Sequence, residues 1–152
     1  LTKEVDDEIA KIKAIAGEYM ALAGKLQAIL NSYYKINVFS YVDETGETKS
    51  VDWSNTTDRD FSKVAEWLKS EIAIYEKNDP EVADSEGKIK DAEAAVAKAQ
   101  KNLDRWIADG EFDTVAEKQL ALDQAKAYLE TLKARYDFAL SQLNDYVAAL
   151  SK

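Results

Sequence analysis

The feature that most constrains the fold is a row of apolar residues near the C-terminus, spaced alternately three and four residues apart. The stretch 114–151 contains this row and has neither glycine nor proline. The residues that we assign to a helix–helix seam are Leu129, Leu132, Tyr136, Leu143, Tyr146 and Leu150. Such spacing places apolar side chains on one face of a helix that packs against another helix. We therefore predict a long helix over 114–151, with a capping box that starts at Thr114.

A second row with the same spacing occupies the N-terminal stretch and predicts a helix over 3–35. Its seam residues are Ile12, Tyr19, Leu26, Leu30 and Tyr33. The two predicted helices have similar lengths, the same apolar period and tyrosines within their seams. Antiparallel pairing would bury both seams, so we predict a long antiparallel intramolecular coiled coil as the spine of the molecule.

The segment after the first predicted helix changes its pattern twice. Apolar and polar residues alternate on both sides of a turn at Asp43–Gly46. This arrangement predicts a β-hairpin over 37–53. Helical spacing then returns and predicts a shorter helix over 58–77.

Two residues mark the limits of a further helix, predicted over 80–108. Pro80 favours the first turn of a helix, because its missing N–H needs no partner there. Gly110 is typical of a helix end, and a tight turn at this residue would bring the helix antiparallel against the last one. Together the patterns predict an all-α chain with a single domain over 1–152. The expected architecture is an elongated helical bundle around a long antiparallel coiled coil, with a small β-hairpin after the first helix.

Composition argues against catalysis. The 152-residue chain has no cysteine and no histidine, which removes thiolate nucleophiles, imidazole bases and the usual zinc ligands. No pair of carboxylates is singled out by its position, so we expect neither enzyme activity nor a cofactor. The net charge of −9 disfavours nucleic acid as a partner, because phosphates would be repelled. No apolar run approaches the roughly 20 residues of a bilayer span, so we expect no membrane span.

Three segments, in the same order along the chain, carry a resemblance to a known family. In the first helix and the hairpin they comprise Lys11–Ile15, Tyr19–Met20, Ala28, Tyr33–Tyr34 and Glu44–Asp52. In the last helix they comprise Thr131–Leu132, Arg135–Tyr136, Ala139, Ser141, Val147 and Leu150–Ser151. These segments resemble the needle-tip invasins of type III secretion systems in enteric pathogens. Residues 58–115 depart from that family, whose distal domain is larger and mixed.

The resemblance implies a mechanical function on the bacterial surface. Proteins of that family cap the secretion needle, control secretion and support translocator assembly on host contact. The implied protein is secreted, lies at the needle tip, and has the needle subunit, translocator proteins and further copies of itself as partners. The residues implied in needle contact are Tyr136, Ser141, Asn144, Asp145, Ser151 and Lys152. A bile-salt-like ligand is implied near Tyr33, Tyr34 and Phe39.

Other interpretations of the sequence remain open. Residues 81–143 resemble the Ala-Lys-Gln-rich hairpin in the coiled-coil ectodomain of a type III translocator. A helical surface adhesin or a bacteriocin receptor-binding domain is a further alternative. The aromatic residues Phe39, Tyr41 and Trp53 fit either an anchor for a partner or a cover for the bundle end. Because the chain begins at Leu1 rather than methionine, we also expect natural N-terminal residues to precede it.

Overall fold

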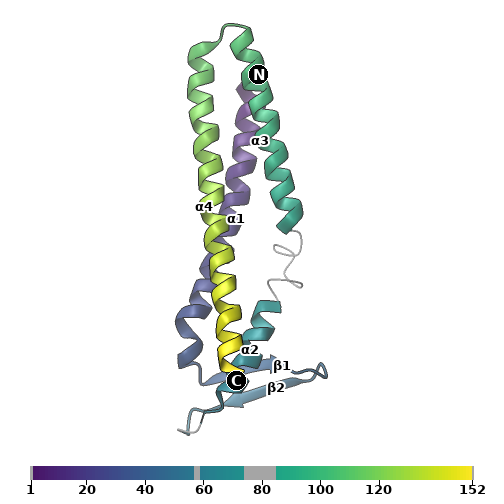
Figure 1. The fold of residues 1–152 in the computed structure, drawn as a ribbon, viewed down its shortest axis with the longest axis vertical. Coiled ribbons are helices and arrows are strands. Elements are labelled where there is room, and N and C mark those ends of the chain that lie inside the picture. Colours follow the sequence, from purple (N-terminus) through teal and green to yellow (C-terminus); the bar gives the residue numbers. More distant parts are fainter. Residues whose placement is uncertain (1, 57–58, 74–84, 152) are drawn as a thin grey trace. The chain divides into compact units, whose positions relative to one another are not determined.

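The described residues form four α-helices and one β-hairpin, so the predicted helical class with a hairpin after the first helix is confirmed. The computed structural model describes residues 2–56, 59–73 and 85–151 (Figure 1). In chain order the elements are α1 (Thr2–Ser32), the 3-10 helix η1 (Tyr33–Lys35), β1 (Val38–Val42), β2 (Thr48–Asp52), α2 (Phe61–Ala73), α3 (Ser85–Ala108) and α4 (Phe112–Leu150). The predicted helix starts at 58 and 80 and the predicted helix end at 77 lie outside the described residues.

The turn between α3 and α4 is tighter than the sequence pattern suggested. Gly110 adopts a positive φ of 86°, and the Glu111 N–H donates to the Trp106 carbonyl at 3.1 Å. This arrangement is a left-handed glycine cap that closes α3. Glu111 alone separates this cap from α4, which begins at Phe112. Thr114 therefore lies inside the first turn of α4 and not at its N-cap, which corrects the predicted start.

The described chain folds as two compact units, and both long helices contribute to each of them. The first unit comprises α1 up to residue 22, the whole of α3, and α4 up to residue 136. The second unit comprises the remainder of α1, followed by η1, the hairpin and α2, and the remainder of α4. Because α1 and α4 continue through both units, the single-domain organisation stays a prediction.

In the first unit, α1 and α4 run in the same direction, so the predicted antiparallel pairing of these helices is wrong (Figure 1). Near the start of both helices, the Asp6 carboxylate pairs with Lys118 at 2.8 Å between Oδ1 and Nζ. Further along both helices, the rings of Tyr19 and Tyr136 meet with their centroids 5.5 Å apart. Residue numbers therefore rise together along the two helices.

The antiparallel neighbour of both long helices in this unit is α3. Glu8 pairs with Lys98 at 3.3 Å, and Glu18 pairs with Lys88 at 3.1 Å, so numbers rise along α1 as they fall along α3. The turn at Gly110 then reverses the chain again, which gives α4 the direction of α1. Heptad spacing specifies which face of a helix is buried but leaves the direction of its partner open. That is why the two seams alone did not reveal a parallel pair.

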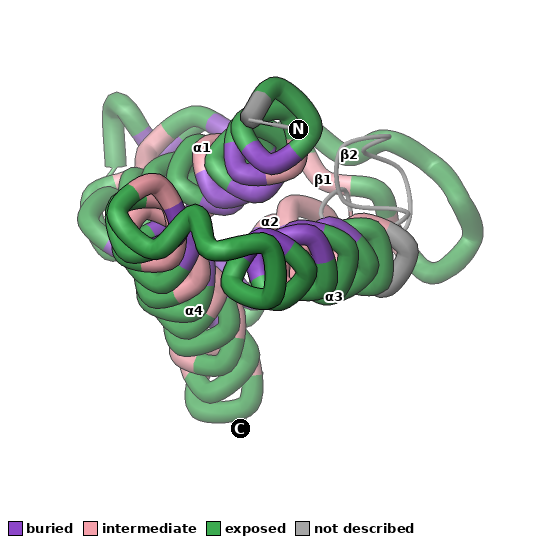
Figure 2. The backbone as a smooth tube through the Cα atoms, turned by 90° about the horizontal axis from the view of Figure 1, so that it is seen from above, coloured by how far each residue is buried: buried purple, intermediate pink, exposed green. Residues whose placement is uncertain are grey.

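The core of the first unit combines large aliphatic side chains with alanines. Leu103 of α3 and Leu122 of α4 are fully buried. The Ala-rich stretch of α3 contributes Ala92, Ala95 and Ala99 to the same core, where small side chains let helices approach closely. Figure 2 shows the buried residues of α1 and α3 on the sides of these helices that face each other. The heptad rows are thus the buried surface of this unit.

The hairpin of the second unit is held by its turn and by a regular ladder. β1 pairs antiparallel with β2, from Val38 opposite Asp52 to Val42 opposite Thr48. The turn lies at the predicted place, because Gly46 takes a positive φ of 84° and its N–H donates to the Asp43 carbonyl at 3.1 Å. Glycine suits this conformation because it has no Cβ to clash.

One face of the hairpin packs against α2 and forms the core of this unit. Phe39 and Val51 lie opposite each other on this face and are both buried. The buried residues of α2 are Val64, Ala65, Leu68 and Ile72. The Phe39 ring lies 6.2 Å from the Trp67 ring of α2, measured between centroids. Alternation in β1 and helical spacing in α2 therefore direct their apolar faces toward the same core.

Candidate functional site

The predicted spine residues of the first unit are buried. They are Ile12, Tyr19, Leu129, Leu132 and Tyr136. Tyr19 and Tyr136 pack edge to face, with an angle of 62° between their rings. Such edge-to-face packing stabilises an aromatic pair beyond the burial of its area. These residues therefore contribute to the core, and Tyr136 is not available on the surface for the needle contact that the resemblance implied.

The spine residues of the second unit divide into buried and half-buried positions. Leu26, Leu30 and Leu143 are buried, whereas Tyr33, Tyr146 and Leu150 are half-buried. Tyr33 and Tyr146 stack with their centroids 4.7 Å apart. Burial, with smaller effects from Tyr146 and Tyr34, raises the pKa of the Tyr33 hydroxyl. The seam is thus less completely covered near the end of α4 than in its middle.

The residues implied in needle contact share one exposed face at the end of α4. Ser141, Asn144 and Asp145 are all exposed, and their spacing of three and four residues places them on the same side of the helix. Ser151 follows α4 and is also exposed, whereas Lys152 lies outside the described residues. The Asn144 amide donates to the Leu140 carbonyl of its own helix at 3.1 Å.

One further residue of this face was not predicted from the sequence. Phe138 is 64 % exposed, and it precedes Ser141 by three residues, so it lies on the same side of α4. We call Phe138, Ser141, Asn144 and Asp145 the outer face of α4. The sequence did contain a signal for its exposure. Phe138 lies outside the heptad row, so the spacing assigns it no place in the core.

The aromatic residues of the hairpin mainly cover the core. Phe39 and Trp53 are buried, and their rings meet edge to face with centroids 5.2 Å apart. Tyr41 is half-buried beside Phe39. Of the two uses expected for these residues, covering the core therefore fits Phe39 and Trp53. In this position they are not exposed as anchors for a partner.

The residues implied in binding a bile-salt-like ligand take part in two different aromatic clusters. Tyr33 contacts Tyr34 and Tyr146, whereas Phe39 contacts the tryptophans of the hairpin and α2. Tyr34 is exposed, and the Lys35 ammonium lies 5.3 Å from the centre of its ring. The bile-salt-like ligand stays a prediction.

Comparison with protein-family models, with curated proteins and with solved structures finds no match to this chain. Within the described residues, no group of three or more His, Cys, Asp or Glu side chains is placed to hold a metal ion. No helix in the same part of the chain has an apolar stretch long enough to cross a bilayer. The resemblance to needle-tip proteins therefore stays a prediction from the sequence.

Proposed function

We propose that this chain is a non-catalytic binding and assembly protein whose partner docks on the outer face of α4. In its specific form, the proposal is a needle-tip protein of a type III secretion system, which caps the needle, controls secretion and supports translocator assembly on host contact. The observation that carries the proposal is the exposure of Phe138 beside Ser141, Asn144 and Asp145.

The composition of the outer face supports a role in docking. An exposed phenylalanine supplies apolar area that gains free energy when a partner covers it. Aromatic residues are enriched among the side chains that dominate binding energy, and polar residues commonly form the rim around them. Leu143 on the opposite side of the helix is fully buried and holds this part of α4 in place. A rigid helix loses little entropy when a partner binds.

The specific form of the proposal rests on the resemblance in α1, the hairpin and α4. The implied contact residues Ser141, Asn144 and Asp145 are exposed, which agrees with a contact surface. The parallel direction of α1 and α4 differs from the antiparallel coiled coil that we expected. The structural feature that supports this resemblance is therefore the outer face of α4 and not the arrangement of the long helices.

Immunogold labelling of intact bacteria that produce this chain tests the proposal. We expect gold at the ends of needles for the native chain and for Phe112→Asp, and loss of this label for Phe138→Asp. Phe112 is the matched control, because it is 65 % exposed, lies on the same helix and is outside the outer face. Label spread over the cell wall would contradict the needle tip and favour an adhesin or a bacteriocin domain.

A second candidate function is the coiled-coil ectodomain of a type III translocator. The observation that favours it is the antiparallel α3–α4 hairpin of the first unit. This helical hairpin covers much of the stretch 81–143, which carries the resemblance to a translocator ectodomain. Gln100 and Gln119 join the two helices through reciprocal amide hydrogen bonds of 2.8 and 2.9 Å. Gene products with long apolar segments next to this domain, and label on host membranes instead of needle ends, would support this candidate.

A further inference from the structure

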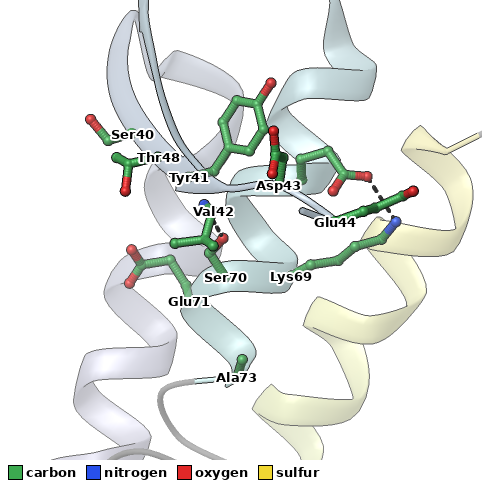
Figure 3. Close-up of a pocket in the computed structure, with 11 residues that line it drawn as sticks. Ser40, Tyr41, Val42, Asp43, Glu44, Thr48, Lys69, Ser70, Glu71 and Ala73 are labelled. Carbon is green, nitrogen blue, oxygen red and sulfur yellow. Dashed lines mark hydrogen bonds and ion pairs between the residues drawn. The ribbon is translucent and has the colours of Figure 1, made fainter. Parts of the chain in front are cut away.

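The hairpin and α2 of the second unit line an open cavity of about 580 Å³ (Figure 3). Its lining comes from β1, the turn after β1, the first residue of β2, and α2. The Val42 N–H donates to the Ser70 hydroxyl at 3.0 Å, and this bond ties the edge of β1 to α2 beside the cavity. Small-molecule sites have volumes of roughly 300–1,000 Å³. The cavity is therefore large enough for a small organic ligand.

The charged side chains that line the cavity are mostly acidic. They are the carboxylates of Asp43, Glu44, Glu66 and Glu71 and the ammonium group of Lys69. Glu66 pairs with Lys69 at 2.9 Å, so these two charges offset each other. Asp43 accepts hydrogen bonds from the N–H groups of Thr45 and Glu47 at 2.9 and 3.0 Å, and these bonds stabilise the turn. Glu44 is exposed to solvent. The environment of the fourth carboxylate, that of Glu71, is different.

Glu71 is half-buried and has no hydrogen-bond or ion-pair partner among the described residues. Figure 3 shows its carboxylate on the same side of β1 as the side chains of Ser40, Val42 and Thr48. Removal of water by the surrounding protein raises the pKa of this carboxyl. A partly desolvated carboxylate that no described residue pairs with is unfavourable, and a cation placed beside it would reduce that penalty.

The remaining lining suggests what else the ligand must contain. Apolar surface dominates the lining, and Val42 and Ala73 contribute to it. Ser40 and Thr48 also line the cavity, and the Ser40 hydroxyl lies 3.2 Å from the Ser50 hydroxyl. A hydroxyl oxygen can accept a hydrogen bond from a donor group of a ligand. A ligand with one ammonium group and an apolar body matches these features. An anionic ligand such as a bile salt would meet an excess of carboxylates.

We propose that this cavity binds a small organic ammonium compound, with its charged group paired to the Glu71 carboxylate and its apolar body against Val42 and Ala73. The pair is charge-assisted and lies in a partly desolvated site, where such contacts are stronger than on an open surface. The proposal is independent of needle docking, because the outer face of α4 contributes no residue to the cavity.

Titration of the isotope-labelled 152-residue chain with phenethylammonium tests the proposal, with amide chemical shifts as the readout. We expect saturable shifts confined to residues 40–44 and 69–73. Phenethyl alcohol has the same ring and no charge, and phenylacetate has the same ring and a negative charge. We expect both to bind at least about tenfold more weakly, since neither can pair with a carboxylate.

Variants separate this site from general attraction to an acidic surface. Glu71→Gln should weaken phenethylammonium binding by at least about tenfold while circular dichroism melting shows a folded chain. Glu44→Gln, the matched control, removes one negative charge from an exposed lining position and should retain binding. Ala73→Leu should also weaken binding, because a larger side chain fills the space for the apolar body.

Three results would overturn the proposal. One is equal affinity of Glu71→Gln and the native chain for phenethylammonium. Another is equal binding of phenethyl alcohol, which would show that the charge is irrelevant. The third is a set of small shifts spread over acidic residues throughout the chain, which would indicate weak attraction to the net negative charge instead of a site.

Discussion

In the first unit most of the buried side chains between the helices are aliphatic residues and alanines, whereas the core around the hairpin of the second unit combines a cluster of aromatic rings with the aliphatic face of α2. Leu103 and Leu122 represent the first kind of packing and are fully buried. Phe39, with Trp53 and Trp67 around it, represents the second kind. The cavity beside Glu71 lies in this second unit.

Polar contacts also differ between the two units. In the first unit they cross between helices: Gln100 and Gln119 bond to each other, and lysines of α3 and α4 pair with acids of α1. In the second unit several bonds are local, as in the turn where Asp43 accepts from Thr45 and Glu47. Contacts between helices specify register and orientation, whereas local contacts specify a turn. The two units should therefore respond differently to substitution.

The largest effect is expected when a charge enters the seam of the first unit. Tyr136→Asp replaces a buried ring with a carboxylate at a position that is almost closed to solvent. We expect the free energy of unfolding to fall by about 3–5 kcal/mol, as measured by chemical denaturation. Tyr128→Asp on the same helix is the control, because Tyr128 is 43 % exposed and its replacement should lower stability by about 1 kcal/mol or less. Equal losses for the two variants would disprove a buried seam at Tyr136.

The next effect concerns the aromatic core of the second unit. Phe39→Ala removes the ring that contacts Trp53 and Trp67, and we expect a loss of about 3 kcal/mol. Phe61→Ala is the control, since Phe61 is 46 % exposed at the start of α2. Because α1 and α4 run through both units, we also expect Phe39→Ala and Tyr136→Asp to lower one shared unfolding transition. Two separate transitions in calorimetry would show that the chain is not a single domain.

A smaller effect is expected at the amide pair between α3 and α4. Gln100→Leu leaves the part-buried Gln119 without its reciprocal partner, which should lower stability by about 1–2 kcal/mol. The double variant Gln100→Leu and Gln119→Leu should lose less than the sum of the two single losses, because two apolar groups can pack together. A double-mutant cycle measures this difference. Additive losses would argue that the two amides act independently.

The smallest effect is expected at Glu71 and concerns pH. Desolvation raises the pKa of Glu71 in the folded chain, so the folded state keeps this proton to higher pH than the unfolded state does. The contribution of Glu71 to stability should therefore fall as pH rises through its raised pKa, whereas the lowered pKa values of Asp43, Asp52 and Asp60 act in the opposite direction in the native chain and in the variants alike. Relative to the native chain, Glu71→Gln should therefore gain stability as pH rises and be slightly more stable at neutral pH. Unfolding at about pH 4 and about pH 7 measures the difference, and Glu44→Gln controls for the loss of one negative charge.

Much of the secondary structure follows from local patterns that need no partner to be recognised. The turn at Asp43–Gly46 was predicted because glycine tolerates the positive φ that such a turn requires. Phe39 and Val51 alternate with polar residues, and both face the core. Thr114 was placed wrongly as a helix start, since the cap at Gly110 leaves a shorter connection than the pattern implied. Helix ends depend on such individual hydrogen bonds and are less certain than helix interiors.

The exposed and functional positions were harder to predict. Ser141, Asn144 and Asp145 were assigned to one surface by resemblance, and the helix does place them on one exposed face. Phe138 was missed, because its exposure depends on which sides of α4 other elements cover. Glu71 was missed as well, since a single glutamate in a short helix has no distinctive spacing. It lines a cavity together with residues of the hairpin, and sequence spacing does not record such a long-range arrangement.

The sequence by itself determined which faces of the helices are buried. Residues such as Ile12, Leu132 and Leu143 follow from heptad spacing, because burial of one helix face is a local and periodic property. The tertiary structure alone decided that α1 and α4 run in parallel within the first unit and that Glu71 lines a cavity in the second. Both depend on contacts between residues far apart in the chain, and one seam pattern is compatible with either direction of its partner.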